Sequence, residues 1–269
     1  VCFGWMVEID PFAPESNPKK RTAMGRFGHE GVVFAPAEEG KPVVCYSGDD
    51  SRFEYIYKFV TASNYNAATA SGDMLDEGTL YVAKFNDDGS GEWLSLVYGE
   101  NGLDETHRPE WGAVDPANGD VYFTLTNNSN RSAGQVDEAN PRGPNLHGHI
   151  IRWSETGGDQ AATTFNWDIF LFGGDSGESG QDTNIGYDPN GDQLTADNIL
   201  SSPDGMWIDP DSRVWIQMDS GFDDPYGNCA MLVADPRKGT LKRFLVGPID
   251  QEITGITMSP DQKTLFINV

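Results

Sequence analysis

Four copies of a short hairpin pattern constrain this chain more than any other feature. Each copy places an acidic residue just before a glycine, and the glycine opens a short apolar strand that ends in proline. The four acid-to-glycine steps are Glu30-Gly31, Glu110-Trp111-Gly112, Asp204-Gly205 and Glu252-Ile253-Thr254-Gly255. A polar turn and a second apolar strand follow each proline, so one hairpin recurs with a carboxylate at its start.

This recurrence predicts a ring of strands that aims four carboxylates at one point. Converging carboxylates cannot all stay ionised unless a cation lies among them. The repeat therefore predicts both an architecture and a metal site formed by Glu30, Glu110, Asp204 and Glu252. For Asp204 and Glu252 the alternative is a turn carboxylate that accepts hydrogen bonds from nearby backbone N–H groups.

Between these hairpins lie strand pairs of a second kind, which are short, rich in aromatic and β-branched residues, and alternate with a period near two. They fall at residues 54–60, 79–85, 92–98, 149–153, 164–172, 230–234 and 241–246, and a further pair joins residues 3–10 to 21–27. Two hairpins make one four-stranded blade, so we expect an all-β protein with a β-propeller fold and about four blades in this chain. A β-sandwich is the alternative, and the repeated proline turns favour the propeller.

The charge and length of the chain exclude several classes of partner. Its 42 Asp and Glu residues outnumber 18 Lys and Arg residues, which gives a net charge of −24. Nucleic acids and anionic membranes are therefore excluded as partners, and no apolar run is long enough to insert into a membrane. We expect residues 1–269 to form one propeller domain, incomplete at both ends because the chain lacks a starting Met and stops within a strand, and to act as a monomer.

The three cysteines show neither paired spacing nor zinc-ligand spacing. Cys45 and Cys229 lie in apolar strand-like runs, so we expect buried and unreactive thiols. The setting of Cys2, near the end of the chain, gives no prediction.

The segment Arg108-Pro109-Glu110 is the strongest catalytic candidate. Alternation along an extended strand places Arg108 and Glu110 on one face, where a guanidinium can grip a phosphate while the carboxylate binds a metal ion. The alternative is a surface ion pair.

Further candidates come from loops. The acidic run that contains Asp49, Asp50 and Glu54 offers the oxygen ligands that Ca²⁺ prefers, although a solvated loop would have the same composition. Arg142 could reach a phosphate from the loop 140–143, and His29 is expected at the surface.

Several longer phrases carry a family resemblance. They are GWMVEIDPF at 4–12, GRFGHEG at 25–31, YSGDDSRFEYIYKF at 46–59, RPEW at 108–111, GDVYFTLTNN at 119–128, NLHGHIIRW at 145–153 and SPDG at 202–205. Together, and in this order, they resemble the PhoX family of calcium-dependent alkaline phosphatases. The resemblance covers the whole chain.

This resemblance implies a six-bladed propeller, export to the periplasm or beyond the cell, and hydrolysis of small-molecule phosphate monoesters at a cluster of Fe³⁺ and Ca²⁺ ions. It also implies that Glu30 is an iron ligand. Two departures stand out: the family's Thr-Cys-Glu-Glu-Asn phrase, which supplies a cysteine and a glutamate to the iron site, has no match here, and the family has a longer stretch around Leu103 and Asp104. We therefore interpret the chain as a fragment.

The function expected from these observations is metal-dependent hydrolysis of phosphate monoesters. The sequence contains no phosphate-binding P-loop and no Ser or Thr in a nucleophile setting, so the chemistry must come from metal ions. A calcium-dependent lactonase of the propeller type is one alternative, although it needs no arginine beside its metal. A non-catalytic propeller that binds a partner, or an inactive remnant of the enzyme, is the other.

Overall fold

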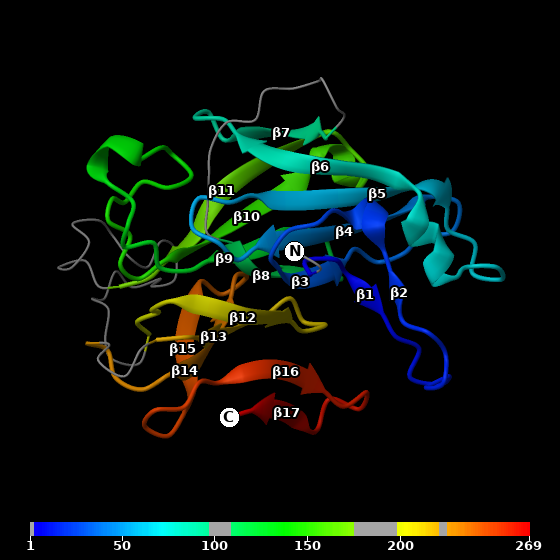
Figure 1. The fold of residues 1–269 in the computed structure, drawn as a ribbon. Helices are drawn as coiled ribbons and strands as arrows, with labels where there is room; N and C mark the ends of the chain where they lie inside the picture. The colour runs from blue at the N-terminus through cyan, green and yellow to red at the C-terminus, as the bar shows by residue number, and fades with distance from the viewer. Residues whose placement is uncertain (1–2, 97–108, 175–197, 221–224) are drawn as a thin grey trace.

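The structure is a computed structural model, and it describes residues 3–96, 109–174, 198–220 and 225–269 (Figure 1). Within these ranges the regular secondary structure consists almost entirely of antiparallel strands. Its helical elements there are short 3₁₀ turns, namely η1 (Thr22–Met24), η2 (Gly72–Asp76), η3 (Ala133–Gln135) and η4 (Thr156–Gly158). Over the same residues, no helix has the length and apolar character needed to cross a membrane.

The described strands form the blades of a β-propeller, as the sequence predicts. The first blade contains β3 (His29–Phe34), β4 (Pro42–Asp49), β5 (Ile56–Asn64) and β6 (Gly78–Phe85). The second contains β8 (Pro109–Val114), β9 (Val121–Leu125), β10 (His149–Glu155) and β11 (Thr164–Phe172). The third contains β12 (Pro203–Ile208), β13 (Val214–Met218), β14 (Ala230–Asp235) and β15 (Thr240–Val246), and the pair β16 (Thr254–Met258) and β17 (Leu265–Asn268) begins a fourth.

The first strands of the blades lie against one another. Strand β8 packs between β3 and β12, and β12 packs against β16. Figure 1 shows β8, β12 and β16 following one another down the middle of the molecule. Because each acidic repeat residue lies at or just before the start of a first strand, this arrangement brings the four repeats to a common centre.

The first two blades are joined more closely than the repeat pattern predicts. Strand β7 (Ser90–Ser95) pairs with β6 on one side and with β11 on the other, so both blades belong to one nine-stranded sheet in the described part of the chain. Gly91 permits this junction, since a Cβ atom there would lie 2.1 Å from the ring of Phe165. Contacts between strands so far apart in sequence leave no local pattern.

An aromatic core fills the space between these two blades and encloses an ion pair. Its largest buried members are Tyr46, Trp93, Phe123, Trp153 and Phe165. A second core, between the second and third blades, contains Tyr122, Phe170, Met206, Ile216 and Leu232. Burial of this apolar surface at each blade interface is the main stabilising contribution to the assembly.

The enclosed ion pair joins Lys58 of β5 to Glu155 of β10. Lys58 Nζ lies 3.1 Å from Glu155 Oε1, and both side chains are almost completely buried. Lys58 also donates to Ala162 O at 2.7 Å, and the Tyr46 hydroxyl donates to Glu155 at 2.8 Å. Burial lowers the pKa of Lys58 to about 8 and raises the pKa of Glu155. This buried ion pair therefore links the first blade to the second.

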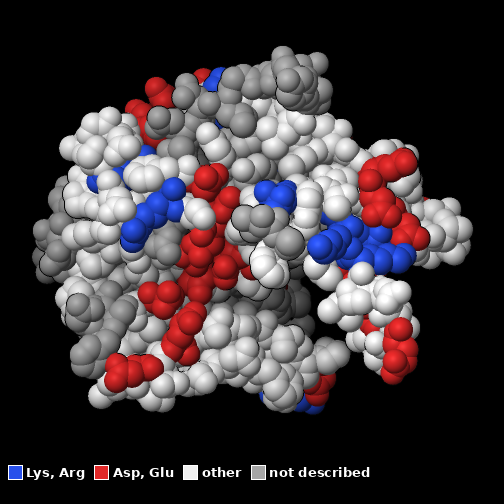
Figure 2. Space-filling model, in the orientation of Figure 1, with Lys and Arg blue, Asp and Glu red and all other residues white. Residues whose placement is uncertain are grey.

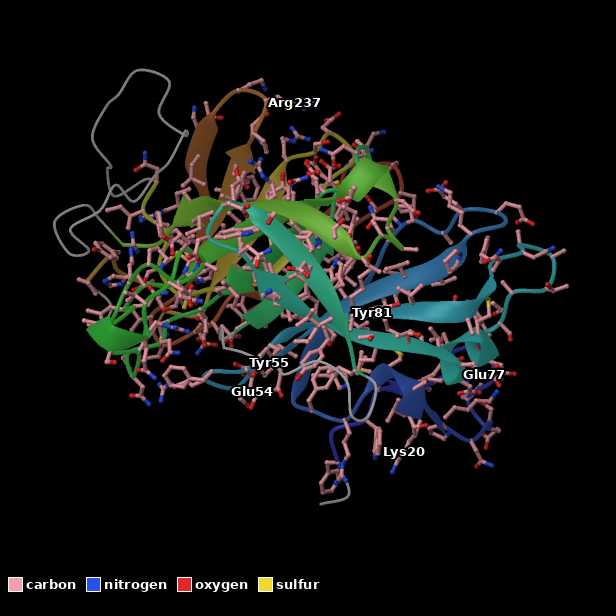
Figure 3. All side chains as sticks on the ribbon, turned by 90° about the horizontal axis from the view of Figure 1, so that it is seen from above. Lys20, Glu54, Tyr55, Glu77, Tyr81 and Arg237 are labelled. Carbon is pink, nitrogen blue, oxygen red and sulfur yellow. The ribbon has the colours of Figure 1, made fainter. Side chains whose placement is uncertain are left out.

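The N-terminal arm joins the two segments that the sequence predicts to pair, although its regular strands are short. Strand β1 (Val7–Glu8) pairs with β2 (Lys19–Lys20), and residues 3–10 and 21–27 are joined by a bridge between Trp5 and Arg26 and by backbone hydrogen bonds from Arg21 N–H to Met6 O and from Phe27 N–H to Gly4 O. Arg21 is buried and donates to the carboxylates of Glu8, Asp73 and Asp76, which fixes the arm to η2. Figure 3 shows Lys20 of this arm at the opposite edge of the molecule from Arg237.

Candidate metal centre

The structure brings the acidic residues of the repeats together. One carboxylate oxygen from each of Glu30, Glu110 and Asp204 lies within 4.8 Å of the others, although the residues belong to three different blades. The fourth acid, Glu252, forms a hydrogen bond with Asp204, and its charge acts on both Asp204 and Glu30. Figure 2 shows acidic side chains in a band down this face, across the region where β8, β12 and β16 lie one above another.

A β-bulge in each first strand accounts for this convergence. Strand pairing is interrupted between His29 and Val32, between Pro109 and Gly112, and between Pro203 and Met206, so the interruptions span Glu30, Glu110 and Asp204. The fourth first strand is interrupted between Thr254 and Ile256. Because a bulge turns side chains away from the regular alternation, it accounts for the direction of the carboxylates of Glu30, Glu110 and Asp204, whereas Glu252 lies ahead of its interruption.

Close packing or backbone conformation favours glycine in three of the four repeats. A Cβ atom on Gly112 would lie 2.3 Å from the Phe123 ring, and one on Gly205 would lie 2.2 Å from Gln217 Oε1. Gly255 adopts a positive φ of 58°, which residues other than glycine rarely adopt. In the hairpins of Gly112 and Gly205, the glycine therefore allows the second strand to cover the bulge closely.

Burial and mutual repulsion disfavour the ionised form of this cluster. Glu110 is 6% exposed and Asp204 is 9% exposed, whereas Glu30 and Glu252 lie at the exposed side. Burial raises the pKa of Asp204 to about 7, and the charges of Glu252 and Glu30 raise it too, against the lowering effect of its hydrogen bond with Glu110. Burial, followed by Asp50 and Glu252, raises the pKa of Glu30. Such a cluster holds either protons or a cation.

The predicted acidic run divides into two parts. Asp50 lies near enough to Glu30 to raise its pKa, so it extends the cluster. Glu54, which Figure 3 shows beside Tyr55, has a pKa raised by burial and by the charge of Asp49. Asp49 is buried, and its Oδ1 atom accepts no hydrogen bond from the residues that the structure describes. A buried acceptor of this kind is suited to a cation.

His29 corrects the prediction of a surface histidine. Its ring is half-buried, packs 3.6 Å from the Phe27 ring centroid, and places Nδ1 2.8 Å from Ser47 Oγ. Ser47 in turn donates to Gly31 O at 2.7 Å, so the pair supports the bulge that carries Glu30. No local pattern predicts this contact, because Ser47 lies on the neighbouring strand β4.

The structure describes only one of the two arginines that are predicted to bind phosphate. Arg108, like Cys2, Leu103 and Asp104, lies outside the described residues. Arg142 is buried, donates to Gly173 O at 2.6 Å and stacks its guanidinium 4.2 Å from the Phe172 ring centroid, and burial lowers its pKa to about 10. Its role in binding phosphate stays a prediction.

Two of the three cysteines lie within the described residues. Cys45 and Cys229 are buried free thiols, as predicted, and burial raises the pKa of Cys45 to about 12.

A cavity of about 520 Å³ opens beside Glu252, and Asp219, Ser220 and Asn228 contribute to its lining. The acidic cluster therefore has an adjoining space in which a small molecule could lie.

The donor set fits hard cations. Ca²⁺ binds carboxylate oxygens at about 2.4 Å, so two ligands on opposite sides of one ion are separated by about 4.8 Å. The oxygens of Glu30, Glu110 and Asp204 satisfy this limit. Carboxylates also suit Fe³⁺, whereas among the described residues no cysteine joins the cluster to favour a soft metal.

Comparison with known proteins identifies the family. The family model for alkaline phosphatase PhoX matches residues 2–269. The structure of Pseudomonas fluorescens PhoX in complex with vanadate, a transition-state analogue, superposes with a TM-score of 0.86 at 42% sequence identity and covers 98% of this chain. The chain belongs to the PhoX family. The resemblance drawn from its sequence phrases is thereby confirmed, and so is the propeller fold.

The PhoX relative is much longer than this chain, which spans 52% of its length. The structure of XC5397, a gluconolactonase from Xanthomonas campestris, also matches over 89% of this chain and 95% of its own chain. Its sequence identity is 14% and its TM-score is 0.29, so it supports no conclusion about this chain. No curated protein matches the sequence.

Proposed function

We propose that this chain supplies part of the active site of a metal-dependent phosphatase that hydrolyses small-molecule phosphate monoesters. The observation that carries this proposal is the convergence of Glu30, Glu110 and Asp204 from three blades, with Glu252 beside them. Membership of the PhoX family supports it, because the family model is that of an alkaline phosphatase and a relative at 42% identity was solved in complex with vanadate, a transition-state analogue.

Ca²⁺ and Fe³⁺ are the proposed metals. Glu30, Glu110, Asp204 and Glu252 would hold them, and Asp50 and the buried Asp49 Oδ1 with Glu54 would provide further oxygens. Bound metal ions would supply Lewis acidity toward the phosphoryl oxygens and the departing oxygen.

The chain's own residues would bind and orient the ester. Arg108 is proposed to hold the phosphoryl group, since a guanidinium offers two parallel hydrogen bonds to phosphate, and Arg142 is a second candidate from its loop. The cavity of about 520 Å³ beside Glu252 provides room for the organic part of the ester. We also propose, from the family, that the protein is exported to the periplasm or beyond the cell and acts as a monomer.

Thermal unfolding of this chain with Ca²⁺ and with a chelator tests the metal site. A ligand present at 100 times its dissociation constant stabilises the folded state by about 2.7 kcal/mol. We expect Ca²⁺ to raise the Tm of the unmodified chain and of Asp87→Asn, an exposed control outside the cluster, but not of Asp204→Asn. Equal Tm values with Ca²⁺ and with chelator would contradict the metal site.

Activity assays address the reaction itself. Hydrolysis of a chromogenic phosphate monoester that depends on added metal would support the proposed phosphatase. Hydrolysis of a lactone instead would favour the lactonase alternative, and metal binding with neither activity would favour a non-catalytic propeller.

A further inference from the structure

Thr124 connects the bulge that carries Glu110 to the bulge that carries Asp204. It is completely buried on β9, directly opposite the bulge residues Glu110 and Trp111. Its Oγ1 accepts a hydrogen bond from Trp111 N–H at 2.8 Å. The same oxygen lies 2.8 Å from Asp204 O and 2.9 Å from Trp111 O, so its proton is donated to these carbonyls. One hydroxyl thus bonds the backbone beside one carboxylate and the backbone of another.

The next blade repeats this arrangement. Gln217 on β13 lies opposite the bulge of Asp204 and Gly205, and its Nε2 atom donates to Gly255 O in the bulge of β16, at 3.3 Å. Gln217 is 1% exposed. In both blades, the side chain opposite a bulge therefore reaches forward to the bulge of the following blade.

We propose that Thr124 is a positioning residue of the metal centre, which holds the carboxylates of Glu110 and Asp204 at the spacing that a cation needs. This inference rests on the proposed function. Glu110 and Asp204 belong to different blades and repel each other when ionised, so a fixed backbone link between them opposes their separation. Groups that orient metal ligands typically affect metal affinity or activity by about 10- to 100-fold.

Thr61 provides a matched control. This buried threonine on β5 accepts from Val43 N–H at 2.9 Å and donates to Ser63 O at 2.7 Å. It therefore makes the same two kinds of bond as Thr124, but within the outer part of one blade and without contact with the carboxylate cluster. Thr61→Val removes a bridging hydroxyl without affecting the link between blades.

The test is calorimetric titration of Ca²⁺ into the unmodified chain and into Thr124→Val, Thr124→Ala, Thr124→Ser and Thr61→Val. We expect Thr124→Val to raise the Kd for Ca²⁺ by about 10- to 100-fold. Thr124→Ser keeps the hydroxyl and should bind Ca²⁺ with a Kd close to that of the unmodified chain. Thr61→Val should bind Ca²⁺ like the unmodified chain. Thr124→Ala replaces Thr124→Val if the added methyl group prevents folding, and the same loss is expected.

The outcomes separate the two proposals. If the unmodified chain binds Ca²⁺ and Thr124→Val or Thr124→Ala binds it with the same Kd, the positioning role is overturned and the metal site stands. If Thr124→Ser loses as much affinity as Thr124→Val, the hydroxyl is not the group responsible. If the unmodified chain binds no Ca²⁺, the proposed metal site fails, and the positioning role fails with it.

Discussion

Asp204 and Glu110 share a side-chain hydrogen bond although they belong to different blades of the propeller. Asp204 forms a second such bond with Glu252. Two carboxyl groups can bond in this way only when one of them carries a proton, and a cation bound between them would take the place of that proton. The cluster is therefore poised between a protonated form and a metal-bound form.

The stability of the metal-free protein is predicted to depend on Asp204 and pH. Its pKa is raised from 3.8 to about 7 by burial, so between about pH 4 and pH 7 the folded state stays protonated while the unfolded state ionises. Stability is then lost as the pH rises through this window and is level above it. In chelator at pH 8, Asp204→Asn should stabilise the chain, by on the order of 4 kcal/mol, with little effect at pH 4.

Urea unfolding across this pH range measures the effect. Asp87→Asn, which changes an exposed turn residue, is the control and should follow the profile of the unmodified chain. Parallel profiles for Asp204→Asn and the unmodified chain would show that Asp204 does not titrate abnormally.

Gly112→Ala is predicted to destabilise the fold and weaken the metal site together. The added methyl group would lie 2.3 Å from the Phe123 ring, and overpacking of this kind typically costs about 1–3 kcal/mol. Because Gly112 closes the bulge that carries Glu110, the Ca²⁺-dependent rise in Tm should shrink as well. Gly134→Ala is the control, since nothing lies within 4 Å of its added Cβ atom. Unchanged stability in Gly112→Ala would mean that the bulge adapts freely.

Lys58→Met is predicted to destabilise the chain by about 3–5 kcal/mol, because it leaves the Glu155 carboxylate buried without its cation. Lys84→Met removes the partner of Glu92 in an exposed pair of similar length, 3.3 Å, and should cost less than about 1 kcal/mol. Denaturant unfolding of both variants gives the comparison. Similar losses for the two would show that the Lys58 pair is not insulated from water.

Much of the fold could be predicted from the sequence because its signals are local. Short apolar runs define β4, β10 and β13, and glycine, proline and aspartate mark the turns between the strands. The repeated acid-to-glycine step also predicted which carboxylates meet, since equivalent positions in successive blades face a common centre.

The remaining features depend on partners that are distant in sequence. Thr124 lies 80 positions from Asp204, whose carbonyl it contacts, and nothing in its neighbourhood distinguishes it from other strand threonines. The bulges, too, are defined by the register with a second strand rather than by the first strand alone. Similarly, β7 joins two blades through a contact with β11 that no alternation pattern predicts.

Arg108 and Glu110 are predicted to have separable roles. Arg108→Ala should lower hydrolysis of a model monoester by on the order of 10²- to 10³-fold while metal content is unchanged, because the guanidinium is proposed to stabilise charge on the phosphoryl group without binding the metal. Glu110→Gln should lower activity and metal content together, since its carboxylate belongs to the cluster. Both variants are compared in the active protein by paired activity assays and metal analysis. Full activity in Arg108→Ala would leave the surface ion pair as the explanation of that residue, and full metal content in Glu110→Gln would remove Glu110 from the ligand set.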